Sequence, residues 1–222
     1  MAIRDFGTRW GARRLAIALL LIPILTAAPD AANRRKEASW HAVQIWGQPE
    51  GLPQNSVLAL LQTRDGYLWI GTKAGVSRFD GVRFTTFDDR TKSLKENEVW
   101  ALAEGDDGAI WIGTFGGGLS RLKDGKFSSF TTKEGLVNDY VTTLHKAADG
   151  SLWIGTDSGL SRLKDNQFTN YTVKEGLSKN AVRALFTDRD GTLWIGSRSK
   201  KEEPGVFSLG YRTFDEINKP PK

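Results

Sequence analysis

Two histidines and a repeated set of aspartates are the side chains of this sequence that first suggest chemistry. Histidine exchanges protons near neutral pH, and carboxylates act as acids, bases or ligands of hard cations. His41 and His145 are the only histidines, and cysteine is absent. No Gly-x-Ser-x-Gly motif and no paired-histidine metal spacing occurs. The sequence therefore predicts a non-catalytic protein, although two carboxylates distant in sequence could still form a glycosidase or lyase site.

The aspartates recur in one context, because Asp65, Asp107, Asp149 and Asp190 are each followed by glycine. Calcium takes about six to eight oxygen ligands, and these segments lack the distal acidic residues of a calcium loop. An Asp-Gly pair between apolar strands is typical of a tight hairpin, since glycine accepts positive φ at no steric cost. We predict turns here, with no metal and no cofactor.

Positions that differ between otherwise similar segments are better candidates for ligand binding. A short variable loop follows each Gly-Thr or Gly-Ser pair, and these loops contain Lys73, Phe115, Asp157 and Arg198. Ligands commonly bind where loops from several units converge on one face. We expect these four residues to contact a ligand; plain solvated turns are the alternative.

A second set of polar residues stands just before four predicted inner strands. Asn55, Asn97, Asp139 and Asn180 each precede a Val by two residues. Such side chains commonly cap an incoming loop by accepting bonds from its backbone. They are expected on the same face as the variable loops, so ligand contact is the second interpretation.

The aspartates and the variable loops named above lie in or beside an eight-residue segment that recurs along the chain, here called the frame. Residues 65–72 read DGYLWIGT, and the frame returns at 107–114, 149–156 and 190–197, with tryptophans 42, 42 and 41 residues apart. A period in the low forties indicates stacked repeats. A binding site has no reason to recur in every repeat, so we predict packing between repeats rather than a sugar platform. The residues concerned are Trp69, Trp111, Trp153, Trp194, Gly71, Gly113, Gly155 and Gly196.

Each repeat contains four short apolar segments: the strand after the Asn/Asp lead, the Trp-Ile-Gly strand, a Gly-Leu-Ser-Arg-Leu strand and a Phe-x-x-Phe/Tyr strand. In the fourth repeat the last segment is expected at Tyr211 and Phe214. Four antiparallel strands per unit are typical of a propeller blade. The predicted fold is an all-β propeller of four four-stranded blade-like repeats. The expected blades are 51–90, 91–132, 133–174 and 175–216, followed by a tail at 217–222.

The N-terminal region has the order of an export signal. Basic residues precede the apolar run Leu15–Leu25, and small residues follow it. This run of 11 residues is short for a membrane span of about 20. We predict a signal peptide or an N-terminal anchor at 1–32, a linker at 33–39 and a leading strand at 40–46. Export to the periplasm or the cell exterior follows, with inner-membrane anchoring if the signal stays uncleaved.

Charge and composition exclude few classes but bear on nucleic acids. The formal net charge is +5, and it falls to +3 without residues 1–30, which hold four arginines and two aspartates. Lysine and arginine alternate with acidic residues along the repeats instead of forming a basic stripe. We therefore expect no nucleic-acid partner, and membrane contact only through the N-terminal segment.

The repeats resemble the two-component regulator propeller repeat. The segment NSVLALLQTRDGYLWIGTKAGVSRFDGVRFTTF and its three successors carry the resemblance, which covers about residues 40–214. Trp40, Trp46 and the segment 50–57 are similar to the usual opening of that family's periplasmic sensor region. The resemblance implies an extracytoplasmic sensing part of a membrane-bound sensor kinase, and several members detect glycan fragments. Members usually carry more blades, a membrane helix and signalling domains, so a short or truncated member is expected.

Closure of the propeller stays open at the level of sequence. By its strand pattern each repeat supplies its own outermost strand, so the leading strand has no host blade. Three outcomes remain: a four-bladed ring, an open arc, and an assembly completed by a partner. An open arc would expose apolar blade faces and favour association.

The sequence thus predicts a periplasmic module that senses a ligand or binds another protein. The expected partners are an oligosaccharide or other small ligand, another propeller or sensor protein, or a second copy of the chain. A carbohydrate-active propeller enzyme is one alternative. A truncated, non-signalling remnant of a larger sensor is the other.

Overall fold

A computed structural model describes residues 44–177, 179–198 and 207–211 of the chain. Two units are distinguished, Met1–Gln44 and Ile45–Lys222, and the strands of the described residues belong to the second. No helix among the described residues is long and apolar enough to cross a membrane. Several predicted features lie outside the described residues: the signal or anchor, the linker, Trp40, Phe214 and the tail 217–222.

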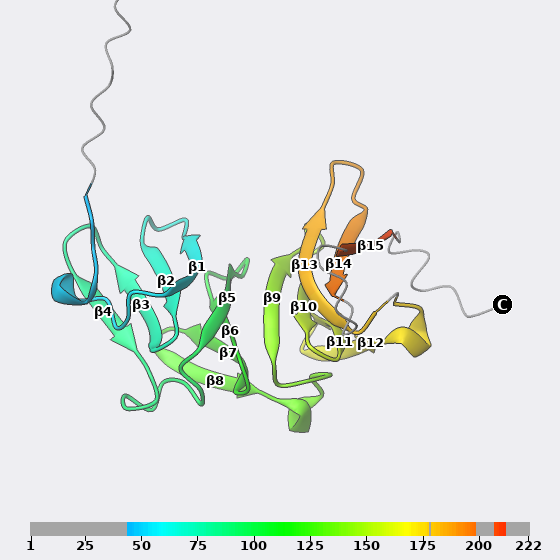
Figure 1. The fold of residues 1–222 in the computed structure, drawn as a ribbon, viewed down its shortest axis with the longest axis horizontal. Coiled ribbons are helices and arrows are strands. Elements are labelled where there is room, and N and C mark those ends of the chain that lie inside the picture. Colours follow the sequence, from blue (N-terminus) through cyan, green and yellow to red (C-terminus); the bar gives the residue numbers. More distant parts are fainter. Residues whose placement is uncertain (1–43, 178, 199–206, 212–222) are drawn as a thin grey trace, which may run out of the picture. The chain divides into compact units, whose positions relative to one another are not determined.

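The second unit is a series of antiparallel sheets in chain order (Figure 1). Three sheets have four strands, and the described part of the fourth has three. The first sheet contains β1 (Val57–Gln62), β2 (Leu68–Thr72), β3 (Gly75–Phe79) and β4 (Phe84–Phe87). The second contains β5 (Val99–Glu104), β6 (Ile110–Thr114), β7 (Gly118–Lys123) and β8 (Lys126–Phe130). The third contains β9 (Val141–Lys146), β10 (Leu152–Thr156), β11 (Gly159–Lys164) and β12 (Gln167–Tyr171). The fourth contains β13 (Ala181–Thr187), β14 (Leu193–Arg198) and β15 (Phe207–Tyr211).

Within each four-stranded sheet the strands pair in sequence order, as the strand pattern predicts. The first strands of neighbouring sheets also contact one another, β1 with β5, β5 with β9 and β9 with β13. This is the all-β propeller arrangement, with each sheet acting as one blade. The four-bladed ring, the open arc and the assembly completed by a partner all stay predictions.

The Asp-Gly turns place glycine where positive φ is required. In the first sheet the Thr63 amide donates to the Tyr67 carbonyl (2.9 Å), and the Gly66 amide donates to the Thr63 carbonyl (2.8 Å). Gly66 has φ +91°, a conformation that an L side chain adopts only with strain. The loop between β1 and β2 has five residues, 63–67, instead of two, and Asp65 and Gly66 are the third and fourth of them.

Packing between neighbouring sheets explains why the Trp-Ile-Gly strand recurs. A Cβ placed on Gly71 would lie 2.7 Å from Val99 Cγ1, and one placed on Gly113 would lie 2.4 Å from Val141 Cγ1. Only glycine lets the next inner strand approach this closely. We call this contact between a glycine and the valine of the following sheet the Val–Gly joint. It also occurs between Gly155 and Val182.

The repeated tryptophans belong to the same packing. Trp69 and Trp153 are buried, with about 4% and 3% of their surface exposed. Trp111 is partly buried and packs against the core between the second and third sheets. Trp194, on the last sheet, is also partly buried. The prediction that these tryptophans are packing residues agrees with this placement.

Two predicted strands differ from the structure. The prediction of a leading strand at 40–46 is wrong for its described residues, 44–46, which have no strand structure. Trp46 instead packs on Phe79, with ring centroids 5.2 Å apart. Tyr211 was expected in an outermost strand, but it lies in β15 and pairs with Trp194, as Arg78 pairs with Trp69. The long connection after Arg198 shifts the third strand along the chain to this position.

Candidate ligand-binding face

The variable loops and the Asn/Asp leads lie together, as predicted. In the first three sheets, the loop between the second and third strands is hydrogen-bonded to an Asn/Asp lead, either that of the same sheet or that of the next. The Gly75 amide donates to the Asn97 carbonyl (2.9 Å), and the Asp157 amide donates to the Tyr140 carbonyl (3.1 Å). The Phe115 amide donates to the carbonyl of Glu98 (2.9 Å). One end of the sheets therefore carries both sets of predicted residues; we call it the loop face.

The Asn/Asp leads cap the incoming loops. Asn55 Oδ1 accepts from the Gln48 amide (2.9 Å), and Asn180 Oδ1 accepts from the Val173 amide (2.8 Å). Asn97 and Asp139 accept equivalent backbone bonds, from Asp89 and Thr132. The capping interpretation is confirmed for all four residues. Their contact with a ligand stays a prediction, because one carboxylate or amide oxygen can accept further bonds.

Three glutamates on the same leads were missed by the sequence reasoning. They close short 3-10 helices named η2 (Gln48–Glu50), η3 (Thr132–Glu134) and η4 (Val173–Glu175). In η3 the Glu134 carboxylate accepts from the Thr131 amide (2.6 Å), and in η4 Glu175 accepts from the Thr172 amide (2.8 Å). The signal was available as a recurring Glu-Gly-Leu, a capping pattern in which the leucine is buried.

An aromatic cluster is the most distinctive feature of the loop face. Trp100 of β5 stacks on Phe115, with ring centroids 4.9 Å apart and planes 17° apart. Tyr140, just before β9, meets Phe115 edge-on at 4.8 Å. Tyr140 is 43% exposed, so part of its ring is open to solvent. Of this cluster, only Phe115 was a predicted ligand residue. Trp100 and Tyr140 were not predicted, because no pattern in the sequence distinguishes them.

Charged groups border the aromatic cluster. Trp100 Nε1 donates to Glu98 Oε1 (3.0 Å). Asp157, a predicted ligand residue, forms an ion pair with Arg183 at 2.5 Å. Lys73 and Arg198, the other two predicted residues, are exposed on the first and last sheets. The structure thus places Phe115 and Asp157 on neighbouring loops beside Tyr140, and gives Lys73 and Arg198 no part in this cluster.

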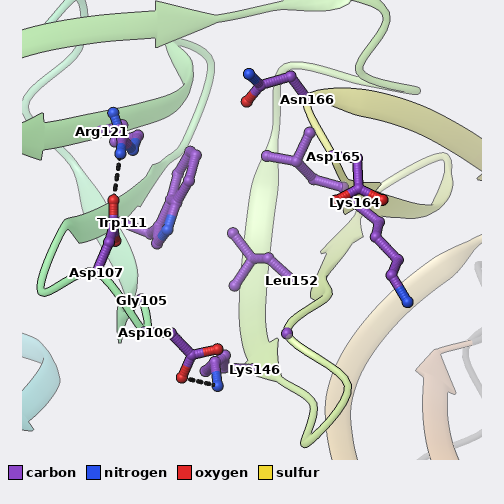
Figure 2. A pocket seen from close by; sticks show the side chains of 12 residues that line it. Gly105, Asp106, Asp107, Trp111, Arg121, Lys146, Leu152, Lys164, Asp165 and Asn166 are labelled. Atoms are coloured by element: carbon purple, nitrogen blue, oxygen red, sulfur yellow. Dashed lines mark hydrogen bonds and ion pairs between the residues drawn. The ribbon is translucent and has the colours of Figure 1, made fainter.

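A pocket of about 270 Å³ lies at the opposite end of the second and third sheets. It lies among the turns at 105–109 and 164–166, and Trp111 forms part of its wall (Figure 2). Sequence reasoning did not predict it, because its residues come from turns that all repeats share. Four of its charged side chains form two ion pairs, Arg121 with Asp107 at 2.5 Å and Lys146 with Asp106. The loop face is the stronger candidate for a sugar because its aromatic cluster includes the exposed Tyr140.

The repeated aspartates serve the turns at this end. Asp107 accepts from the Ala109 amide (3.1 Å), and Asp149 accepts from the Ser151 amide (3.0 Å). Burial alone would raise the pKa of Asp149, but bonds from Ser151, Lys164 and Arg162 outweigh it and hold that pKa well below its ordinary value. Asp65 makes a longer bond to the Tyr67 amide (3.4 Å). The turn interpretation is confirmed for these three aspartates.

The fourth turn uses a different aspartate. Asp188 Oδ1 accepts from the Thr192 amide (2.9 Å), and Asp188 Oδ2 accepts from Trp194 Nε1 (2.7 Å). Asp190, the predicted residue, is instead a donor through its backbone amide to Asp188. Asp188 and Asp190 are two residues apart. The repeated eight-residue frame pointed to Asp190, whereas Asp188 accepts the hydrogen bonds of this turn.

His145 has a structural position. Its Nε2 lies 2.7 Å from Thr187 Oγ1, across the contact between the third and fourth sheets. Burial lowers the pKa of His145, which favours the neutral ring. Within the described ranges, no three His, Cys, Asp or Glu residues gather as metal ligands would.

Comparison with known families decides what these repeats are. A family model described as the two component regulator propeller matches residues 51–74, 93–116, 135–158 and 176–199. The chain carries four two-component regulator propeller repeats. Each matched segment runs from the Asn/Asp lead through the first two strands of a sheet and their Asp-Gly turn into the variable loop.

The chain is similar to solved structures of extracellular domains of two-component systems. The chain is 28% identical to the extracellular domain of hybrid two component system BT3049 from B. thetaiotaomicron, with a TM-score of 0.59, over 63% of this chain and 20% of that one. The corresponding domain of BT4673 from the same organism is 21% identical, with a TM-score of 0.56, over 66% and 22%. The chain therefore spans about a fifth of the length of these domains. None of the curated proteins matches the sequence.

A propeller enzyme shares the fold as well. Virginiamycin B lyase from Staphylococcus aureus matches with a TM-score of 0.54 and 18% identity, over 72% of this chain and 57% of that one. At this identity the match shows the fold alone. The regulator propeller therefore resembles sensor domains in sequence and structure, and lyases in fold only.

Proposed function

We propose that this regulator propeller is an extracytoplasmic, non-catalytic sensing module that binds an oligosaccharide on its loop face. The observation that carries the proposal is the cluster of Trp100, Phe115 and Tyr140. Aromatic rings offer flat apolar surfaces against which sugar rings stack. Tyr140 is the exposed member; Phe115 contacts its ring edge-on, and Trp100 stacks on Phe115.

Polar groups beside the rings would supply the hydrogen bonds that a sugar requires. Glu98 is bound to Trp100, and the Asp157–Arg183 pair stands next to Tyr140 through the Asp157 amide. A carboxylate accepts bonds from sugar hydroxyls, and a guanidinium donates to acidic sugars. An acidic oligosaccharide would therefore gain from Arg183 in a way that a neutral one would not.

Export of the chain is part of the same proposal. The basic, apolar and small-residue order of residues 1–32 supports a signal peptide or an anchor. The extracellular domains to which the repeats are similar support the same side of the membrane. Detection of the mature N-terminus in the periplasmic fraction would test it, and a chain retained in the cytoplasm would contradict it.

Calorimetric titration with short neutral and acidic oligosaccharides tests the binding site. We expect Tyr140→Ala to weaken binding by up to about tenfold, because an aromatic contact contributes about 0.5–1.5 kcal/mol beyond the area it buries. Tyr140→Phe is the matched control, and it should retain binding because it keeps the ring. Mass spectrometry of the mixtures must show intact sugar; a shortened or unsaturated product would favour the carbohydrate-active enzyme instead.

A further inference from the structure

A Val–Gly joint connects every pair of neighbouring sheets among the described residues. The valine of the first sheet and the glycine of the fourth sheet take part in none of these joints. Inside the chain the valine of each joint is fully buried, with 0% of its surface exposed. The joints are Gly71 with Val99, Gly113 with Val141, and Gly155 with Val182. Each of the four sheets supplies one valine and one glycine, so three joints use three of each.

The valine that remains is Val57, at the start of β1. It is 42% exposed, although its position in the repeat is that of Val99. Leu60, on the same strand, is 64% exposed, whereas its counterpart Leu102 packs against the core between the first and second sheets. The first sheet thus presents an apolar face with the valine half of a joint.

The glycine that remains is Gly196, on β14. The three atoms nearest to a Cβ placed there all belong to Ala184 of the same sheet. Phe186, beside it on β13, is 62% exposed, and Ala184 is exposed as well. Their counterparts in the second sheet, Ala101 and Ala103, are 7% and 8% exposed. The fourth sheet thus presents an apolar face with the glycine half of a joint.

We propose that these two faces bind each other between two copies of the chain, with Val57 of one copy against Gly196 of the other. The two faces are the complementary halves of an interface that the chain already forms three times. Two like faces would not fit, because the close approach requires a glycine opposite the valine. Head-to-tail contact at both ends closes two chains into a ring of eight sheets, at the upper end of the about four to eight blades of propellers.

Charges at the rim neither favour nor oppose this pairing. Within the chain, Arg64 of the first sheet pairs with Glu104 of the second, and Asp106 pairs with Lys146 of the third. The positions that would meet between copies are Arg189, the counterpart of Arg64, and Gln62, the counterpart of Glu104. No like charges oppose each other there, so electrostatics does not prevent the joint.

Sedimentation velocity of the full chain over a concentration series tests the proposal. The wild type should form a dimer, and Val57→Asp should be monomeric because it places a charge in an apolar joint. Gly196→Gln should also be monomeric, since its side chain fills the space of the incoming valine. Val173→Asp is the matched control: Val173 is 50% exposed but lies in η4, outside both faces, so this variant should remain dimeric.

Mixing the two variants separates head-to-tail contact from any other kind. Val57→Asp retains Gly196, and Gly196→Gln retains Val57, so an equimolar mixture should form a dimer through one intact joint, with a dissociation constant at least about tenfold weaker than the wild type. Circular dichroism must show an intact fold; if Gly196→Gln unfolds, Gly196→Ala in the same mixture replaces it. A monomeric wild type, dimeric single variants or an assembly larger than two chains would overturn the two-chain ring.

Discussion

The inner joints and the two ends of the propeller carry the same residues in different surroundings. Val99, Val141 and Val182 have no exposed surface, whereas Val57 is 42% exposed. The local sequence and strand structure are alike in all four repeats, so the neighbouring sheet alone makes the difference. In repeat architectures the stability of each unit depends largely on its interfaces with adjacent units, and this chain shows that dependence residue by residue.

The largest difference in lost stability between an inner joint and an end is expected for substitutions of the glycines. Gly113→Val should lower the free energy of unfolding by about 3 kcal/mol or prevent folding, because its Cβ would lie 2.4 Å from Val141 Cγ1. Gly196→Val should cost less than about 1 kcal/mol, since only Ala184 lies close to it. Urea unfolding in the Val57→Asp background keeps association out of both measurements. Equal losses at the two sites would contradict the difference between inner joints and ends.

Truncating the valines should give a contrast of intermediate size. Val141→Ala is expected to lower the free energy of unfolding by about 2 kcal/mol, because it leaves a cavity in a buried joint. Val57→Ala should change it by no more than about 0.5 kcal/mol in a monomer, as for other exposed positions. Chemical denaturation at low protein concentration, where chains are separate, provides the comparison.

Removing a capping side chain should cost the same stability before the first sheet as before the last. The difference between inner sheets and ends would then be restricted to contacts between sheets. Asn55→Ala and Asn180→Ala each remove one side-chain acceptor of a backbone amide, at 2.9 and 2.8 Å. Each should cost about 1 kcal/mol, in the range of lost helix caps. Thermal unfolding of both variants measures this, and a large inequality would show that the caps also depend on their neighbours.

The smallest effect is expected at the turn aspartates and depends on pH. The pKa of Asp149 is lowered in the folded state, so the ionised carboxylate stabilises the fold above its unfolded pKa of about 3.9, and this stability is lost as pH falls below that value. Asp149→Asn should therefore cost up to about 1 kcal/mol at pH 7, because the carboxylate is partly exposed. The difference from the wild type should shrink at pH 3. Asp190→Asn, which alters no side-chain bond of the fourth turn, serves as the control in the same denaturation series.

The sequence was sufficient for most of the repeated features, although the recurring Glu-Gly-Leu caps were missed. The frame around Trp69 predicts the hairpins, the buried tryptophans and the shared face of the loops and leads, because each depends on residues within one repeat or at one fixed position in the next. Tyr211 was assigned to the wrong strand because the connection before β15 departs from the repeat. Residues 44–46 were assigned to a strand on alternation alone, but Trp46 is held by Phe79 and not by a neighbouring strand.

The candidate site was only partly predictable, for a physical reason. Trp100, Phe115 and Tyr140 come from two sheets and meet through side chains. Each stands at a position where the other repeats have different residues, so no period marks them. The exposure of Val57 was equally unpredictable. Its position in the repeat is that of a buried valine, and it is exposed because no sheet among the described residues precedes it.

The joints also determine how far along the chain contacts must reach during folding. Gly71 and Val99 are 28 residues apart, and the later joints have separations of 28 and 27. No joint bridges more than one repeat, so the entropic cost of closing each loop stays nearly constant however many repeats the chain contains. A gene could therefore gain or lose a repeat by duplication or deletion without altering its neighbours, since every new unit would bring one valine for the sheet before it and one glycine for the sheet after it.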